Sequence, residues 1–108
     1  MYRQGDVLIV PIAPGDVPAP VARLPRQPRD ARGRLVLALG EVTGHAHAVL
    51  GPGELVRESG PFALSWLHLP EGGKVVHEEH AEIALPGGWF RVTRQREYVP
   101  GAVRMIAD

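Results

Sequence analysis

Histidines are the residues of this chain whose type and spacing could do chemistry. Four of the five form two close pairs, His45 and His47 in a Gly-His-Ala-His run and His77 and His80 in a His-Glu-Glu-His run. An imidazole can bind a transition metal or move a proton near neutral pH. Two such pairs in 108 residues predict a single site built from both.

The two pairs differ in spacing, and the spacing decides which side chains can share a face. His45 and His47 are two residues apart, so on a strand both imidazoles project from the same face. His77 and His80 are three apart, so an ideal strand would turn them to opposite faces, whereas a helical turn or a bulge would bring them together. We therefore expect only one of His77 and His80 to reach the site, with a neighbouring glutamate beside it.

A metal site is the first interpretation of this pattern. The chain has no cysteine, so any metal must be held by His, Asp, Glu or water. Three or four histidine ligands suit zinc, iron, nickel or copper, and an open coordination position would permit hydrolysis. The sequence thus predicts a divalent transition-metal cofactor.

The same histidines could also work without a metal. One neutral imidazole would take the proton from a 2′-hydroxyl, and a protonated one would supply the leaving oxygen. Arg94 or Arg96 would stabilise the anionic phosphorus centre, and Tyr98 would position the phosphate. This alternative predicts a metal-independent endoribonuclease or phosphodiesterase. Its acid–base and phosphate-binding set is His45, His47, His77, His80, Arg94, Arg96 and Tyr98.

Charge suggests a third interpretation, a non-catalytic module that binds nucleic acid or an acidic protein. Residues 23–34 hold five arginines against the single Asp30. Such a segment could meet phosphates, although a solvated loop is the commoner outcome. The formal net charge of the whole chain is zero, and autonomous nucleic-acid binders usually carry a basic excess. The third interpretation is weaker for that reason.

Glycine and proline set the fold class. Thirteen glycines and eleven prolines interrupt the chain and argue against long helices. The short apolar or alternating runs between them predict a single compact all-β domain over residues 1–108, a small barrel or sandwich of about seven or eight strands. The expected strands are 6–12, 34–39, 45–50, 54–57, 62–69, 74–77, 81–85 and 89–99. Residues 13–33, rich in proline and arginine, form a long irregular loop, and such loops are usually functional or disordered.

Alternation assigns faces on two of these strands. On 62–69, His68 shares a face with Phe62, Leu64 and Trp66. We expect that apolar face in the core rather than on a homodimer surface, and His68 in the core rather than in the site.

On 89–99, the shared face runs through Phe90, Val92, Arg94, Arg96 and Tyr98. One alternative is that this face is buried in the core at one end and lines the site at the other. The other alternative is that the strand leaves the core and becomes exposed.

Location and partners follow from what the sequence lacks. The N-terminus has no long apolar region of the signal-peptide kind, and no apolar stretch is long enough to span a bilayer. We expect a cytoplasmic protein with no membrane partner. Its substrate would be a small molecule or an RNA phosphodiester.

A family resemblance supports the metal interpretation. The residues Gly40, His45, His47, Glu54 and Gly60 resemble a loosely spaced first cupin motif, and Pro70, Gly72 and His77 resemble the second. The resemblance implies a small β-barrel with a metal held by His45, His47, Glu54 and His77. The Thr-Gly-His-x-His, His-Glu-Glu-His and Arg-Glu-Tyr blocks are also similar to those of small uncharacterised bacterial proteins, which implies no particular function.

Overall fold

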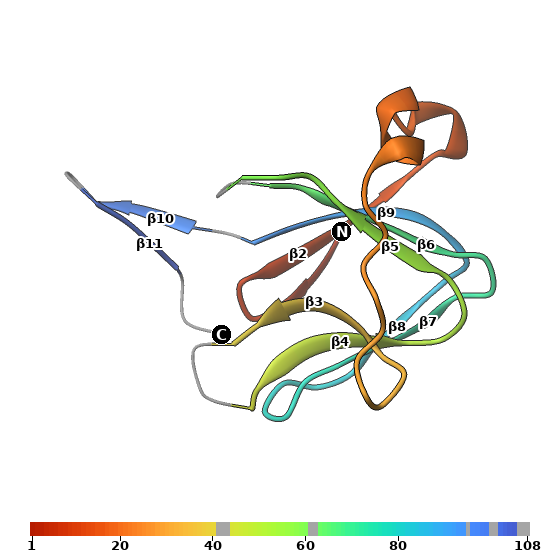
Figure 1. The fold of residues 1–108 in the computed structure, drawn as a ribbon. Helices are drawn as coiled ribbons and strands as arrows, with labels where there is room; N and C mark the ends of the chain where they lie inside the picture. The colour runs from red at the N-terminus through yellow and green to blue at the C-terminus, as the bar shows by residue number, and fades with distance from the viewer. Residues whose placement is uncertain (41–43, 61–62, 95, 100–101, 106–108) are drawn as a thin grey trace.

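Two antiparallel sheets pack face to face as a β-sandwich (Figure 1). The structure is a computed structural model that describes residues 1–40, 44–60 and 63–94, and the backbone of 96–99 and 102–105. One sheet has five strands in the order β1-β2-β9-β6-β5, and the other has four in the order β3-β4-β7-β8. The prediction of an all-β fold is confirmed.

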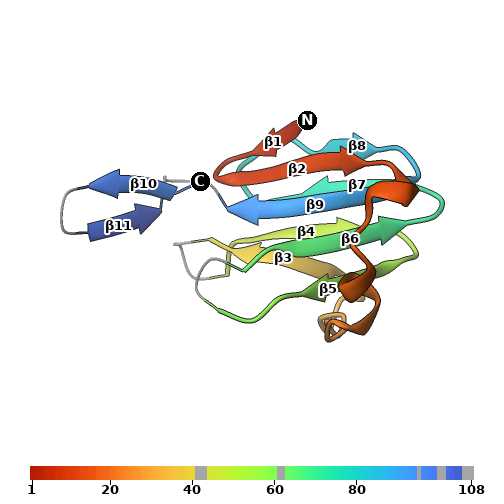
Figure 2. The same ribbon diagram turned by 90° about the horizontal axis from the view of Figure 1, so that it is seen from above.

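The strands of each sheet are short. The five-stranded sheet consists of β1 (Tyr2–Gln4), β2 (Val7–Ile12), β9 (Gly88–Arg94), β6 (Ser65–Leu69) and β5 (Glu54–Arg57). The four-stranded sheet consists of β3 (Leu35–Leu39), β4 (Ala46–Leu50), β7 (Gly73–Val76) and β8 (Ile83–Leu85). A hairpin of β10 (Arg96–Val99) and β11 (Ala102–Met105) lies outside both sheets (Figure 2).

The sandwich decides between the two predicted architectures. Among the described strands, no pairing joins an edge of one sheet to an edge of the other, so the closed-barrel alternative is wrong. Nine strands build the two sheets, against seven or eight expected. The three-residue β1 was missed because so short a run shows no clear alternation, and the expected strand 89–99 is divided between β9 and β10.

Strand alternation separates a core face from an outer face on the five-stranded sheet. Leu67 of β6 lies between Leu55 and Phe90 in the register, and all three side chains are buried in the core between the sheets. Successive strand residues point to opposite sides, so Trp66 and His68 face away from the core. The outer face therefore carries aromatic side chains, and Trp66 is buried there in a second apolar cluster.

The segment 13–33 covers that outer face. It contains the 3-10 turns η1 (Pro14–Asp16) and η2 (Ala19–Arg23), and Val21 of η2 is buried against Val56 and Trp66. Arg29 anchors the segment by donating to the carbonyls of Gly33, Gly51 and Gly53. The predicted irregular connection thus packs on the sheet rather than standing free. No helix in the described part of the chain is long and apolar enough to cross a membrane.

Candidate functional site

Four imidazole rings gather at one end of the sandwich. The ring centroid of His47 lies 4.3 Å from that of His77 and 5.7 Å from that of His80. His77 also lies 4.6 Å from His80 and 5.5 Å from His45. The structure therefore brings the two sequence pairs together, and we call these four residues the histidine cluster.

Pairing between β4 and β7 explains this meeting. Ala48 lies opposite Val76, the last residue of β7, so the chain that leaves β7 runs beside the start of β4. Residues 77–82 do not continue as a strand, and strict alternation ends at Val76. The expectation that only one of His77 and His80 reaches the site is wrong, because both rings contact His47.

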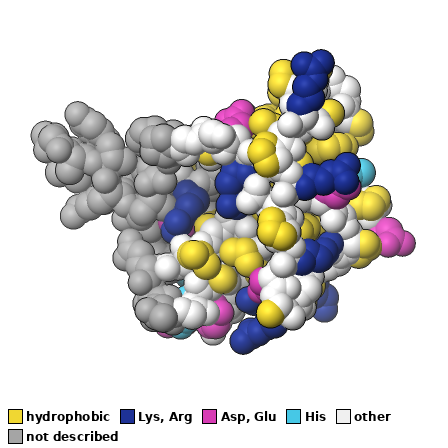
Figure 3. Space-filling view, in the orientation of Figure 1, with side chains coloured by type: hydrophobic (Ala, Val, Ile, Leu, Met, Phe, Trp, Pro, Cys, Tyr) yellow, Lys and Arg dark blue, Asp and Glu magenta, His cyan; other side chains and the backbone are white. Residues whose placement is uncertain are grey.

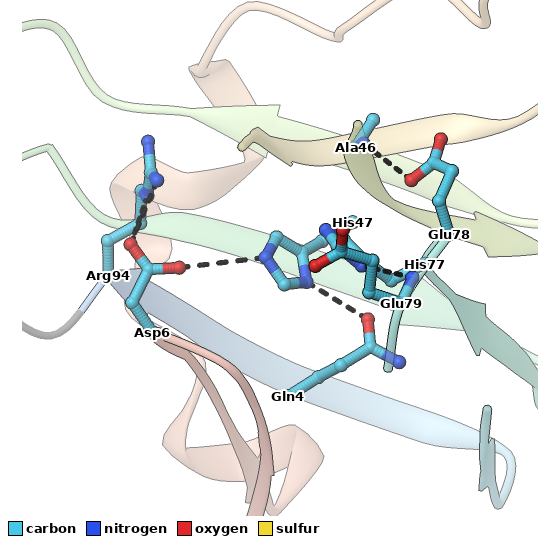
Figure 4. Close-up of polar contacts among 8 residues, drawn as sticks. All are labelled: Gln4, Asp6, Ala46, His47, His77, Glu78, Glu79 and Arg94. Carbon is cyan, nitrogen blue, oxygen red and sulfur yellow. Dashed lines mark hydrogen bonds and ion pairs between the residues drawn. The ribbon is translucent and has the colours of Figure 1, made fainter. Parts of the chain in front are cut away.

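The tautomer of His47 is determined by Gln4. The side-chain amide nitrogen of Gln4 donates to the carbonyls of Val75 and Ala81, at 3.2 and 3.0 Å. Its oxygen therefore faces His47 Nδ1, at 3.0 Å, and an amide oxygen can only accept (Figure 4). His47 Nδ1 must carry a proton, which leaves a lone pair on Nε2 in the neutral ring.

A buried carboxylate faces that second nitrogen. His47 Nε2 lies 3.6 Å from Asp6 Oδ1, and the two side chains are 0% and 1% exposed. The other carboxylate oxygen of Asp6 accepts from Arg94, from Nε at 3.1 Å and from Nη2 at 2.8 Å (Figure 4). A continuous series of polar contacts therefore crosses the interior, and it runs from Arg94 through Asp6 and His47 to Gln4.

Gln4 and Asp6 are functional candidates that the sequence pattern did not identify. They flank Gly5, whose φ of 57° suits glycine, in the tight turn between β1 and β2. No motif surrounds them. The one available signal was a charged residue placed directly before the apolar run 7–12.

The two glutamates between His77 and His80 are exposed, as expected of an acidic turn, yet both have polar contacts at or beside the cluster. Glu78 Oε2 accepts from the backbone N–H of Ala46 at 3.0 Å. That hydrogen bond, followed by the backbone N–H of Glu78 itself and the nearby histidines, lowers the pKa of the Glu78 carboxyl. Glu79 Oε1 lies 3.8 Å from His45 Nδ1, and the Glu79 backbone N–H donates to His77 Nδ1 at 3.0 Å.

Three of the arginines expected to meet phosphate pair with carboxylates of the chain itself. Arg94 is engaged by Asp6, so β9 does end as a wall of the site. In the segment 23–34, Arg26 pairs with Glu54 at 3.2 Å and Arg34 pairs with Asp30 at 2.9 Å. The side chains of Arg96 and Tyr98 lie outside the described residues.

Two predicted placements need correction. Glu54 lies on β5 opposite His68 and belongs to the outer face, so the ligand set that the cupin resemblance implies is not assembled. His68 stacks on Trp89 with ring centroids 4.4 Å apart, on the outer face rather than in the core. Within the described ranges, no group of three or more His, Asp or Glu residues is arranged to hold a metal ion.

A shallow depression of about 200 Å³ adjoins the cluster. Its lining includes Arg32, Arg34, His77 and Glu78. The two guanidinium groups and the imidazole outnumber the one carboxylate, that of Glu78, so the lining is more basic than acidic. Such a lining favours an anionic ligand, because arginine binds carboxylate and phosphate in a planar, bidentate manner.

Comparison with known proteins places the chain in a family. The chain belongs to a protein family described as a domain of unknown function (DUF8820), which matches residues 3–95. The match includes every residue of the series of polar contacts from Arg94 to Gln4 and the whole histidine cluster. No cupin family matches, so the cupin resemblance gains no support. No curated protein and no solved structure matches the chain.

Proposed function

We propose that the histidine cluster binds one divalent transition-metal ion beside His47 and Asp6, and that the protein hydrolyses an anionic substrate held in the adjoining depression. His80 and His77 are the neighbouring imidazoles that could complete the metal's ligands. Zinc, iron, nickel and copper all accept imidazole and carboxylate ligands.

The contact between His47 and Asp6 carries the proposal. Gln4 fixes the proton of His47 on Nδ1, so the Nε2 lone pair faces a carboxylate oxygen 3.6 Å away. Both atoms belong to buried side chains and are of the types that bind metals, so a cation placed beside them would be held by the imidazole nitrogen and the carboxylate oxygen together. Metal–ligand bonds of about 2.0–2.2 Å can span such a gap. An imidazolium–carboxylate hydrogen bond would be shorter, about 2.7–2.9 Å.

His80 is the most suitable third ligand. Its Nε2 atom is buried and has no hydrogen-bond partner among the described residues. His77 is less suitable, because its Nδ1 accepts from the Glu79 backbone and its Nε2 then holds the proton of the neutral ring. The donor atoms do not yet converge on one point, so the proposal requires a rotation of the His80 side chain on binding.

The surrounding residues suit a metal ligand. Histidines that bind metals usually donate their other ring N–H to a carbonyl or carboxylate, which fixes the ring, and Gln4 does this for His47. A metal ion bound here would supply Lewis acidity and lower the pKa of a bound water. Arg32 and Arg34, in the depression beside His77, would hold the anionic group of a phosphoester or similar substrate.

Metal content tests the proposal. Untagged protein, purified without added metal or chelator, should contain about one equivalent of transition metal by mass spectrometry. His80→Gln should lose that metal, and His68→Gln, a histidine outside the cluster, should keep it. Metal-free wild-type protein that no divalent ion stabilises against heat would reject the proposal.

A metal-independent reaction is the second candidate, and His45 favours it. This imidazole is 20% exposed, and its Nδ1 lies 3.8 Å from the Glu79 carboxylate. A carboxylate so placed favours a proton on Nδ1 and leaves Nε2 as a general base. RNA cleavage in excess EDTA, with a bell-shaped pH profile and no cleavage of DNA, would support it. Cleavage retained by a His45→Gln/His77→Gln double variant would reject it.

The remaining expectations stay predictions. They are the cytoplasmic location, the homodimer as an alternative to a monomer, and nucleic-acid or protein binding through residues 23–34. The ion pairs of Arg26 and Arg34 and the hydrogen bonds of Arg29 give that segment a structural role that needs no partner.

A further inference from the structure

A second cavity lies on the outer face of the five-stranded sheet, beneath η2. Its volume is about 160 Å³, and it shares no lining residue with the histidine cluster. Val21 of η2 and Val56 of β5 form an aliphatic side. Figure 3 shows hydrophobic side chains at the upper right, over this covering segment, with basic side chains among them.

Aromatic rings form much of the cavity wall. Trp66 and Trp89 both line it, as does His68, whose ring stacks on Trp89 at an interplanar angle of 11°. Flat indole and imidazole faces favour stacking with another planar ring. Aromatic side chains bind nucleobases in this way in proteins that bind single-stranded nucleic acids.

Hydrogen-bonding groups of both kinds also line the cavity. Arg26 Nη1 and Glu54 Oε1 form an ion pair at 3.2 Å, with side chains 76% and 48% exposed. The guanidinium has further N–H groups and the carboxylate has a second oxygen, so each can bind a ligand while paired. Trp66 Nε1 is buried and, among the described residues, has no hydrogen-bond partner.

We propose that this cavity binds a small planar heteroaromatic ring with a lactam edge, the class that includes the oxopurines and oxopyrimidines. The ring would stack against the aromatic wall. The lactam N–H would donate to Glu54, and the lactam carbonyl would accept from Arg26.

Size restricts the ligand further. The cavity is well below the roughly 300–1,000 Å³ of pockets for drug-sized molecules, so it suits one or two fused rings. The inference does not depend on the function proposed for the histidine cluster.

Hypoxanthine and purine are a matched pair of probes, because they differ only in the lactam group. Trp66 and Trp89 are the only tryptophans of the chain, and both line the cavity. The two indole N–H signals in a ¹H–¹⁵N spectrum of the full chain therefore report on it directly. Hypoxanthine should shift both signals. Purine should bind at least about tenfold more weakly, because it has no lactam N–H to donate to Glu54 and no lactam carbonyl to accept from Arg26.

Two variants separate the lactam contact from general loss of structure. Glu54→Gln should weaken hypoxanthine binding about tenfold while the rest of the spectrum stays folded. Glu82→Gln removes an exposed carboxylate that pairs with Lys74, and it should leave binding unchanged. No indole shift with millimolar hypoxanthine would overturn the proposal. Equal binding of purine and hypoxanthine, or equal binding by the Glu54→Gln variant, would overturn the lactam assignment.

Discussion

The histidine cluster and the outer-face cavity are built in opposite ways. The cluster and the polar residues bonded to it come from distant parts of the sequence, since Gln4 bonds to Val75 and Asp6 to Arg94, and these contacts are polar and largely buried. The cavity uses a row of neighbouring strands, with His68 directly opposite its partners on β5 and β9, and its contacts are mainly aromatic and aliphatic. The stability of the region around the cluster should therefore be sensitive to the loss of single polar atoms. The stability of the region around the cavity should instead follow the apolar area that is buried.

That contrast is sharpest for the two arginine–aspartate pairs. Asp6→Ala should destabilise the protein by about 3–5 kcal/mol, because it leaves buried polar groups without their partner. The free energy of unfolding in urea measures this loss. Asp30→Ala removes a partly exposed carboxylate that pairs with Arg34, and it should have a smaller effect because water can solvate the groups left behind. Similar losses for the two variants would contradict the assigned role of the buried pair.

The region around the cavity has one position where a single atom should matter. A Cβ on Gly53 would collide with the backbone carbonyl of His68, and the φ of 146° there disfavours other residues. Gly53→Ala should cost about 2–3 kcal/mol of unfolding free energy. Gly15→Ala, with nothing within 4 Å of the added carbon, is the matched control. A harmless Gly53→Ala would mean that β5 and β6 are less closely packed than described.

Elsewhere on the outer face, the cost of a substitution in stability should follow the apolar area that it removes from the contact. Val21 is the one buried residue of η2, and Val21→Ala should cost about 1.5 kcal/mol because about two methylene equivalents leave the apolar contact. Arg23→Ala in the same turn should change thermal stability little. If Val21→Ala has no effect, the covering segment does not pack on the sheet in solution.

The smallest expected effect concerns Asp30, and it depends on pH. The backbone N–H of Arg34, with further hydrogen bonds, lowers the pKa of the Asp30 carboxyl below its ordinary 3.8. A lowered pKa in the folded state stabilises the protein above the unfolded value, and this stabilisation disappears as pH falls through the folded value. Asp30→Asn should therefore lower the melting temperature slightly at pH 7. The difference from wild type should vanish in strong acid, and a difference that persists there would exclude this electrostatic origin.

Local patterns predicted the strands well and the sites only in part. The run 54–57 coincides with β5, and 45–50 differs from β4 by one residue, since strand alternation and flanking glycines are local signals. That the two histidine pairs form one site could be predicted from the sequence, because two such pairs are unusual in a chain of 108 residues. The sequence did not show that both His77 and His80 reach the site, because this depends on the chain leaving the sheet after Val76.

The long-range contacts of the site could not be predicted from local sequence patterns, for a physical reason. The partner of Asp6 is 88 residues away and that of Gln4 is 43 residues away, and only the sheet order brings them together. Glu54 shows the opposite error, in which a motif-like spacing was assigned to a site on another face. Alternation placed Trp66 and His68 together but could not show that residues 13–33 cover them.

The central claim is that a metal ion binds between His47 and Asp6, and anomalous X-ray scattering tests it most directly. Crystals of the full chain grown with zinc should show an anomalous peak at the zinc edge within bonding distance of His47 Nε2 and Asp6 Oδ1, with His80 turned toward it. A zinc-containing crystal with no peak there, or with peaks only at exposed side chains, would contradict the claim. The histidines would then be better explained as an acid–base group.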